Sequence, residues 1–327
     1  MRALVTGAQG FIGRSLVWHL ARQGWLVTAM DLARPTEPLP SGTTVLTTDI
    51  RVVEQWRAAL EGVEVVIHLA SAHLQVNLPE SAYWETNVKS LRPLLEAARA
   101  AGVQHFVHTS SVGVHGSLAA VPGNEDAPLA PENLYERTKA AGEAEVRRFL
   151  PQAPPMGVTI VRPAWVYGPG DPRTERILGA VARGRFIMFG AGRNQRHPIY
   201  IDDYVRGVER LLLQPQTFGR TYILAGPAYL TARELVRMAE HVTGGKARLR
   251  LPLVLGYAAG LSAELASRVA SVSPPISRRT LAFFMNRNAF DTARARRDFG
   301  FDPSINVVEG FQLVWSAMQQ GRSTSRH

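Results

Sequence analysis

The chain has 327 residues, of which 46% are hydrophobic, 20% are charged and none is cysteine. This balance is typical of a folded chain with one large or two modest domains, and it excludes disorder, a disulfide framework and thiolate chemistry. The net charge of +10 would suit nucleic acid, but the arginines are scattered and no aromatic-flanked basic stripe occurs. We therefore expect an anionic small molecule, or loose contact with an acidic membrane surface, and no nucleic-acid partner.

No apolar run reaches the ~20 residues that a membrane helix needs, so we expect no stable membrane insertion. The longest candidate, residues 251–272, carries Glu264 and Arg268 in its second half. No charged segment precedes the first strand, which argues against a secretory signal. Together with the missing cysteines, this favours a cytoplasmic protein.

Short apolar runs alternate with helical patterns along the first half of the chain. Strands separated by helices predict a parallel sheet with helices on both faces, which is the α/β doubly wound Rossmann-type class. The predicted strands are Arg2–Thr6, Trp25–Met30, Glu64–Leu69, Val103–Thr109 and Val158–Val161.

Gly7, Gly10 and Gly13 form a GxxGxxG pattern between the first strand and a helix. Such glycines allow a tight turn and close approach of a pyrophosphate to the helix N-terminus. A lone glycine pattern is often just a turn, but Asp31 ends the second strand 18 residues after Gly13. A carboxylate there can accept hydrogen bonds from both hydroxyls of an adenosine ribose and would repel a 2′-phosphate. We therefore expect NAD rather than NADP, although the nearby Arg34 argues the other way.

The stretch LYERTK places Tyr135 and Lys139 four residues apart after a proline-rich run. On a helix these two side chains share one face, and an ammonium near a phenol favours the phenolate. A phenol of this kind could exchange protons near neutral pH. Taken alone, however, such a pair is more often a chance match on an amphipathic helix.

After Pro163 the alternation becomes irregular, with glycine and proline clusters and later helices. We predict a dinucleotide-binding domain over residues 1–165 and a smaller substrate-binding lobe over 166–327. The segment 199–224 is expected to return to the first domain.

With these residues in hand, the chain resembles the extended short-chain dehydrogenases/reductases, which include nucleotide-sugar epimerases and 3β-hydroxysteroid dehydrogenases. The resemblance covers nearly the whole chain, and the order and spacing of the motifs are more specific than any one of them. The matching segments are TGAQGFIG from Thr6, Asp49-Ile50, HLA from His68, TNV from Thr86, TSSVGVHG from Thr109, YERTK, RPAWVYGPGD from Arg162, YIDD from Tyr200 and DFGFDP from Asp298.

The resemblance implies a catalytic set of Ser111, Tyr135 and Lys139. Tyr135 would be the general acid/base, Lys139 would lower its pKa and hold the ribose hydroxyls, and Ser111 would hydrogen-bond the same substrate oxygen. Ser110 and Ser111 end an apolar strand and could instead cap a turn, but ligands bind at the carboxyl edge of a parallel sheet.

The resemblance also implies cofactor contacts along the sheet edge. Asp49 and Ile50 resemble the pair beside the adenine, an interpretation about as strong as a simple strand-end turn. Asn87 resembles an asparagine that steadies the central sheet. The implied cofactor residues are Gly7, Gly10, Phe11, Ile12, Gly13, Asp31, Asp49, Ile50, Leu69, Ala70, Ser71, Asn87, Thr109, Ser110, Tyr135, Lys139, Pro163 and Val166.

Two enzyme classes remain open. A hydroxysteroid-dehydrogenase-like enzyme is favoured by RPAWVYGPGD and by the apolar stretch 251–272, which could equally be core or a surface helix. A nucleotide-sugar 4-epimerase would use the same tyrosine, and Arg196, seven residues before Asp203, suits a phosphate. Dehydration is not expected, because Ser111-Val112-Gly113 lacks the acidic pair of that branch. A cofactor sensor without activity is a remote third alternative.

The expected substrate contacts are Ser111, His115, Tyr135, Trp165 and Arg196. His115 departs from the tyrosine usual before this glycine. The histidines show no ligand spacing, so we predict no metal. The resemblance further suggests a homodimer that pairs through the helix around Glu80–Ala101 and the helix that carries Tyr135.

Overall fold

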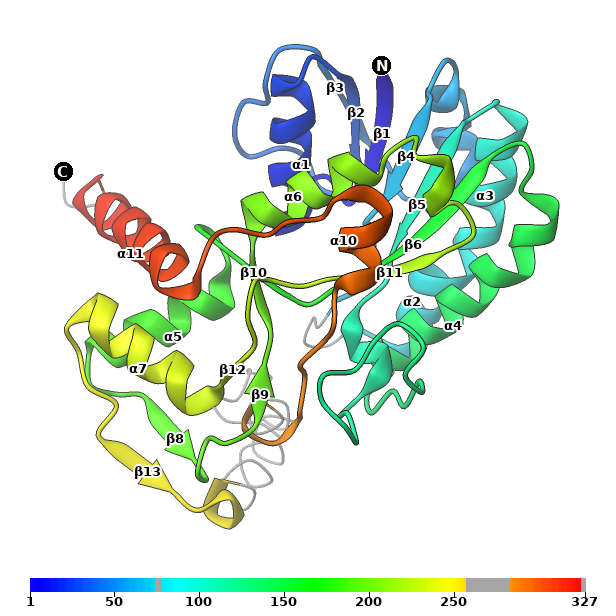
Figure 1. The fold of residues 1–327 in the computed structure, drawn as a ribbon. Coiled ribbons are helices and arrows are strands. Elements are labelled where there is room, and N and C mark those ends of the chain that lie inside the picture. The colour runs from blue at the N-terminus through cyan, green and yellow to red at the C-terminus, as the bar shows by residue number, and fades with distance from the viewer. Residues whose placement is uncertain (74–77, 257–282, 325–327) are drawn as a thin grey trace.

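The structure is a computed structural model that describes residues 1–73, 78–256 and 283–324. A seven-stranded sheet forms its centre (Figure 1), and all of its strand pairs are parallel. The predicted doubly wound α/β class is therefore confirmed. In spatial order the strands are β11 (Thr221–Leu224), β6 (Gly157–Pro163), β5 (His105–Thr109), β4 (Val65–His68), β1 (Arg2–Thr6), β2 (Leu26–Asp31) and β3 (Thr43–Thr47).

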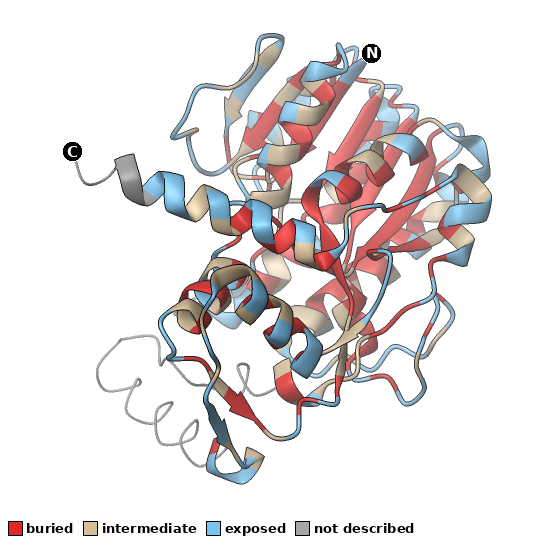
Figure 2. Cartoon of the chain, turned by 60° about the vertical axis from the view of Figure 1, so that its left-hand side comes forward, coloured by how far each residue is buried: buried red, intermediate tan, exposed pale blue. Residues whose placement is uncertain are grey.

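Helices cover both faces of this sheet, which explains why its inner strands are apolar throughout rather than alternating. On one face, α1 (Phe11–Arg22) packs with α6 (Ile201–Leu211) over a shared apolar core. On the other face, α3 (Leu91–Ala100) packs with α4 (Leu134–Phe149). Figure 2 shows the buried strands enclosed between helices whose outer sides are exposed.

The chain enters α3 through an irregular segment. α2 (Glu80–Trp84) is followed by one π-helical turn, Glu85–Lys89, before α3 begins. The sequence predicts an uninterrupted helix here. Short 3-10 turns at Val53–Gln55, Arg57–Leu60, Val112–His115, Leu150–Gln152 and Pro215–Thr217 complete this part of the chain.

The remaining elements form a smaller group beside the carboxyl ends of the strands (Figure 1). α5 (Pro172–Ala182), α7 (Ala232–Thr243) and α11 (Val307–Thr324) pack against one another, and α10 (Ala293–Phe299) lies on β11. Three two-stranded pairs connect them: β7 (Trp165–Tyr167) with β10 (Pro198–Tyr200), β9 (Gln195–Arg196) with β12 (Leu230–Thr231), and β8 (Ile187–Phe189) with β13 (Leu249–Leu251).

Segment 199–224 supplies α6 and the edge strand β11 to the central sheet layer. On this basis we propose that the sheet with its helices is the cofactor domain and that the smaller group is the substrate-binding lobe. Most of the apolar stretch 251–272 lies outside the described residues. Within the part of the chain that is described, we find no helix long and apolar enough to cross a bilayer.

Candidate active site

The glycine turn that joins β1 to α1 leaves no room for side chains at two of its glycines. Gly7 has φ +70°, and a Cβ atom there would lie 2.7 Å from the backbone nitrogen of Ala70. A Cβ at Gly13 would lie 2.1 Å from the carbonyl oxygen of Gly7, so α1 can approach β1 only with glycine at this position. Gly10 is the N-cap of α1, which has no side-chain cap and no acidic residue in its first turn. This helix start therefore suits a phosphate.

Asp31 lies beside this turn. Its Oδ2 accepts a hydrogen bond from the backbone nitrogen of Gln9 at 2.8 Å, and its Oδ1 accepts one from Ala33 at 2.9 Å. The carboxylate is thereby fixed at the carboxyl end of β2, and its remaining lone pairs are suited to ribose hydroxyls. The residues of the turn and Asp31 together fit the adenosine diphosphate half of a dinucleotide.

Asp49 and Ile50 have structural contacts of their own. The Asp49 carboxylate accepts hydrogen bonds from Nε and Nη2 of the Arg51 guanidinium, and this hydrogen bonding lowers the pKa of Asp49. Ile50 is buried, and its carbonyl oxygen accepts from the Trp56 indole at 3.0 Å. A contact of this pair with an adenine remains a proposal.

The turn after β4 is held by two side chains. The Thr6 hydroxyl accepts bonds from the backbone nitrogens of Leu69 and Ala70 at 3.2 and 3.1 Å. The Asn87 amide oxygen accepts from the Ser71 hydroxyl and the Ala72 nitrogen, and its amide nitrogen donates to the Thr138 hydroxyl at 2.9 Å. Asn87 therefore ties this turn to α4, and the steadying of the central sheet that the resemblance implies stays a prediction.

Tyr135 and Lys139 occupy the first two turns of α4. The helix begins with a capping box, in which the Asn133 side chain accepts from the Glu136 backbone nitrogen and the Glu136 carboxylate accepts from the Asn133 backbone nitrogen. The Lys139 Nζ lies 5.9 Å from the centroid of the Tyr135 ring and donates to the carbonyl oxygen of Thr109 at 2.9 Å. This bond joins the tyrosine helix to the end of β5.

Burial dominates the proton equilibria of both groups. It lowers the pKa of Lys139 to about 8, and the neighbouring Glu143 carboxylate opposes this effect. Burial also raises the pKa of the Tyr135 phenol, while the Arg173 guanidinium acts to lower it. The Tyr135 pKa is therefore shifted upward, opposite to the direction that we expect from Lys139, and the phenol is protonated at neutral pH.

Ser111 lies just beyond β5. Its hydroxyl oxygen accepts from the backbone nitrogen of Gly113 at 3.0 Å and caps the turn Val112–His115. The hydroxyl hydrogen of Ser111 can still be donated to a substrate oxygen. Thr109 and Ser110 are buried at the strand end, where the Lys139 bond to Thr109 brings α4 to within two residues of Ser111.

Sequence patterns did not reveal a buried ion pair behind Lys139. Arg162 on β6 donates from Nε and Nη2 to the two oxygens of Glu143 at 2.8 and 2.7 Å, and both side chains are almost fully buried. Arg147 donates to the same carboxylate at 2.8 Å. Two features of the sequence could have predicted this ion pair: Glu143 follows Lys139 by four residues on one helix, and Arg162 lies within an otherwise apolar strand.

His115 belongs to this buried network. Its Nε2 lies 3.0 Å from Nη1 of Arg162, and its Nδ1 lies 3.1 Å from the carbonyl oxygen of Pro128. Because Arg162 can only donate, Nε2 is the acceptor and the ring is neutral, which agrees with a pKa lowered by burial and by Arg162. Both ring nitrogens are engaged, so this geometry does not support the substrate contact predicted for His115.

The other predicted substrate residues gather beside α5. Pro163 ends β6, and Trp165 and Val166 continue into β7. Trp165 packs edge-on against Phe283 at 5.8 Å between ring centroids, and the Arg196 Cζ lies 4.7 Å from the Phe283 ring centroid. Arg173, which the motifs did not single out, stacks on Trp165 with its Cζ 5.8 Å from the ring centroid.

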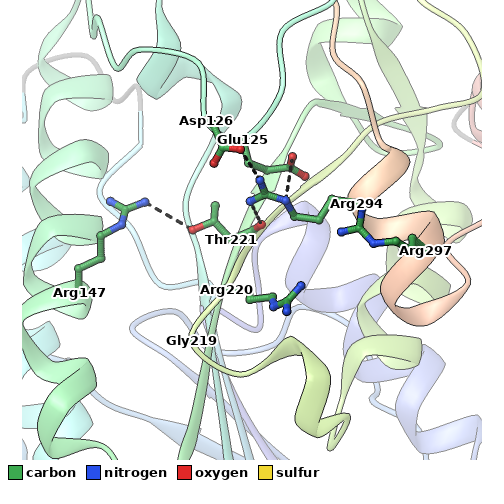
Figure 3. Close-up of a pocket in the computed structure, with 8 residues that line it drawn as sticks. All are labelled: Glu125, Asp126, Arg147, Gly219, Arg220, Thr221, Arg294 and Arg297. Carbon is green, nitrogen blue, oxygen red and sulfur yellow. Dashed lines mark hydrogen bonds and ion pairs between the residues drawn. The ribbon is translucent and has the colours of Figure 1, made fainter.

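A separate hollow of about 450 Å³ lies at the other end of α4 (Figure 3). Arg147, one of its lining residues, follows Tyr135 by twelve residues, or about 18 Å along the helix. Each arginine of the hollow has an acidic partner: Arg147 pairs with Glu143, Arg294 with Asp126, and Arg220 and Arg297 with Asp298. We assign no function to this hollow.

Residues 3–225 match the model of the NAD dependent epimerase/dehydratase family. The chain belongs to this family. Its members use NAD, so the predicted enzyme class and cofactor are confirmed. In this family member, the turn at Gly7, Gly10 and Gly13 fits the cofactor phosphates, and Asp31 fits the ribose.

Relatives agree with this membership, and a solved structure shares the fold. The chain is 28% identical to the 2-alkyl-3-oxoalkanoate reductase of Shewanella oneidensis, with 97% of this chain and 86% of the relative covered. It is 31% identical to sterol demethylase protein B of Methylococcus capsulatus, with 93% and 94% covered. The crystal structure of UDP-glucose 4-epimerase from Thermotoga maritima has the same fold, with TM-score 0.82, 23% identity, and 98% and 100% of the two chains covered.

Proposed function

We propose that this protein interconverts a secondary alcohol and a ketone on a hydrophobic, steroid-like substrate. The observation that carries the proposal is the placement of the Tyr135 phenol above the buried Lys139 ammonium, which is bonded to the end of β5. When bound, NAD supplies the hydride acceptor, and NADH the hydride donor.

The residues of the chain supply the proton chemistry. In the reducing direction, a protonated Tyr135 donates its proton to the carbonyl oxygen as that oxygen gains charge. Lys139, with a pKa of about 8, is mostly charged at pH 7 and stabilises the phenolate that remains. Ser111 orients the same oxygen with a hydrogen bond. In the oxidising direction each step runs in reverse.

A hydrophobic substrate is supported by two observations. The ring of Trp165, one of the expected substrate contacts, packs edge to face against the Phe283 ring. Two relatives, by their names, act on an alkyl-substituted oxoalkanoate and on a sterol. Both names describe molecules with a large apolar part.

A nucleotide-sugar 4-epimerase is the second candidate, and Arg196 favours it. This guanidinium is partly buried beside Phe283 and could bind a diphosphate. An epimerase would interconvert UDP- or GDP-sugars without net NADH, whereas the proposed dehydrogenase would accumulate NADH with hydroxysteroids and related hydrophobic alcohols.

The test is Tyr135→Phe, assayed with both substrate panels. We expect turnover to fall by about 10²- to 10⁴-fold, the usual contribution of a general acid/base, while NAD still binds. Tyr83→Phe, a buried tyrosine on α2, is the matched control and should keep activity. Full turnover in Tyr135→Phe would contradict the proposal, whereas NAD binding without turnover of either panel by the parent protein would favour the cofactor-sensor alternative.

The homodimer through the helical segment around Glu80–Ala101 and α4 stays a prediction. The molar mass in solution, measured by light scattering, tests it: a mass near 36 kDa, that of one chain, would contradict it.

A further inference from the structure

A histidine outside the predicted catalytic set contacts the proposed acid/base. The His73 ring stands perpendicular to the Tyr135 ring, with 4.7 Å between the ring centroids and an interplanar angle of 87°. His73 is exposed, whereas Tyr135 is half-buried. The imidazole therefore lies between solvent and the group that would exchange a proton with the substrate.

One amide fixes the backbone on both sides of this contact. Asn87 accepts from the Ala72 nitrogen at 2.7 Å and donates to the Ala72 carbonyl oxygen at 3.1 Å, which holds the residue before His73. The same amide nitrogen donates to the Thr138 hydroxyl at 2.9 Å, and this hydroxyl donates to the Tyr135 carbonyl oxygen at 2.9 Å. The turn after β4 and the first turn of α4 are thus joined, and the two rings meet where they join.

The Tyr135 phenol needs a path for protons to and from solvent in every turnover. In the reducing direction it gives its proton to the substrate, and a filled active site excludes the water that could replace this proton. Lys139 stabilises the phenolate, but its side chain is almost fully buried and its Nζ donates to the Thr109 carbonyl oxygen. The lysine therefore supplies charge, and its burial separates it from bulk water.

Other ionisable groups that act on the phenol are poor proton carriers near neutral pH. The Arg173 guanidinium acts on Tyr135, but arginine stays charged throughout this pH range. The Glu136 carboxylate closes the capping box of α4, and burial raises the pKa of the Tyr204 phenol on α6. An exposed imidazole ordinarily titrates close to neutral pH, so His73 can both take up and release a proton.

We propose that His73 carries the proton between Tyr135 and solvent, directly or through one water, and so acts on the reaction through the tyrosine. This inference rests on the function proposed above and adds a residue to its proton path. In the reducing direction, the carbonyl carbon gains a hydride from NADH and the carbonyl oxygen gains the Tyr135 proton. The His73 imidazolium then returns a proton to the phenolate, and the neutral imidazole takes one from water. Each ketone reduced thus consumes one NADH and one proton.

The ring contact is tested first, on the cofactor-free protein. Proton NMR of the imidazole C–H signals gives the chemical shift and the pKa of His73, which is assigned by its loss in His73→Gln. We expect a ring-current shift at His73 that Tyr135→Leu removes. The matched control is Tyr229→Leu, which removes a ring packed against His197 at 5.8 Å between centroids and should shift His197 alone. His73 signals that do not move in Tyr135→Leu would overturn the inference before any turnover is measured.

Turnover then tests the proton path, with NAD and with dehydroepiandrosterone as the first hydroxysteroid probe. His73→Gln should lower kcat by about tenfold or more and change KM little, because glutamine can hydrogen-bond but does not titrate. His73→Ala should lose as much, and added imidazole should restore most of its rate but none in Tyr135→Phe. His241→Gln, an exposed histidine on α7, is the matched control and should keep the parent kcat with and without imidazole.

The pH profile separates a proton path from a structural role. Neutral imidazole must accept the proton in the oxidising direction, so kcat should rise with pH through a value close to the pKa that NMR gives for His73. This limb should be absent in His73→Gln, while a limb that arises from Lys139 should remain. A purely structural His73 would lower kcat equally at every pH and would not respond to imidazole, and that result would overturn the proton path.

The remaining outcomes separate this inference from the proposed function. A His73→Gln protein with the parent kcat at every pH would overturn the proton path and leave the dehydrogenase proposal intact. If no hydroxysteroid of the panel yields Tyr135-dependent NADH with the parent protein, the dehydrogenase proposal fails and the proton path fails with it.

Discussion

At the residue scale, Lys139 combines a catalytic position with an unfavourable environment. The side chain is almost fully buried, and burial lowers its pKa from 10.5 to about 8. Between these two pKa values the unfolded chain binds more protons than the folded one, so stability rises with pH across this range. Below pH 8 the buried Lys139 charge has its full effect and lowers the free energy of unfolding by about 3 kcal/mol.

We therefore predict that Lys139→Met increases the free energy of unfolding of the cofactor-free protein at pH 7 while abolishing turnover. The expected gain is about 1–2 kcal/mol, because the lost bond to the Thr109 carbonyl offsets part of the relieved charge burial. Urea unfolding at pH 7 and pH 9.5 tests this, since the gain should shrink at the higher pH. Lys246→Met, an exposed lysine, is the control; a Lys139→Met protein that is less stable at pH 7 would refute the prediction.

Single residues also show how far the sequence could predict the site. The spacing of Tyr135 and Lys139 drew attention to this pair, and the resemblance to the family then indicated that they act together with Ser111. Glu143 and Arg162 pair between a helix and a strand 19 residues apart, and no local pattern encodes that pairing. Arg173 was missed for the same reason, because its partner Trp165 belongs to a neighbouring strand.

At the element scale, the start of α4 determines where the Tyr135 side chain stands. Asn133 is exposed and acts only as the cap, and Tyr135 is the second residue of the helix. We predict that Asn133→Ala lowers stability by about 1 kcal/mol and lowers kcat by about tenfold, because the fraying first turn carries the phenol.

The control is an equivalent cap on another helix. Asn306 accepts from the Glu309 backbone nitrogen at 3.0 Å at the start of α11. Asn306→Ala should cost a similar amount of stability and leave kcat unchanged, as measured by thermal unfolding and steady-state kinetics. If both variants lose kcat equally, the effect is global and the specific role of the α4 cap is wrong.

The strands that could be predicted from the sequence are the buried ones, because burial gives them a continuous apolar run. β1 coincides with the predicted Arg2–Thr6, and β5 begins two residues after the predicted Val103. β3 was missed, because an edge strand with exposed residues lacks the continuous apolar run of the inner strands. The π-helical turn at Glu85–Lys89 was also missed; it contains Asn87, whose bonds to Ala72 and Thr138 cross between elements.

At the scale of the whole molecule, buried histidines link stability to pH. Five of the eight histidines that the structure describes are buried, and burial lowers the pKa of each one: His68, His105, His108, His115 and His197. His105 has a pKa of about 3 and His197 of about 4, against an ordinary value of 6.5. Below pH 6.5 the unfolded chain therefore binds more protons, so stability falls as the solution is acidified.

Two of these histidines can be tested with little change of shape. His105 accepts from the Leu213 backbone nitrogen at 3.0 Å, and His197 accepts from the Phe290 nitrogen at 3.2 Å. An asparagine oxygen can accept the same bonds, but it does not titrate. We therefore predict that His105→Asn and His197→Asn weaken the pH dependence even if each lowers stability at neutral pH.

Each of the two histidines should lower the free energy of unfolding at pH 5 by about 2 kcal/mol relative to its value at pH 7.5. The buried Glu125 and the half-buried Glu136, whose pKa values are raised, act in the opposite direction, so the variants are compared with the parent protein and not with an absolute slope. Urea unfolding at both pH values gives the loss of unfolding free energy between pH 7.5 and pH 5. This loss should be smaller by about 4 kcal/mol in the double variant than in the parent protein. His241→Asn, an exposed histidine on α7, should retain the parent difference. A double variant with the parent's full loss at pH 5 would show that acid instability arises elsewhere, with the carboxylate network around Glu143 and Asp298 as the remaining source.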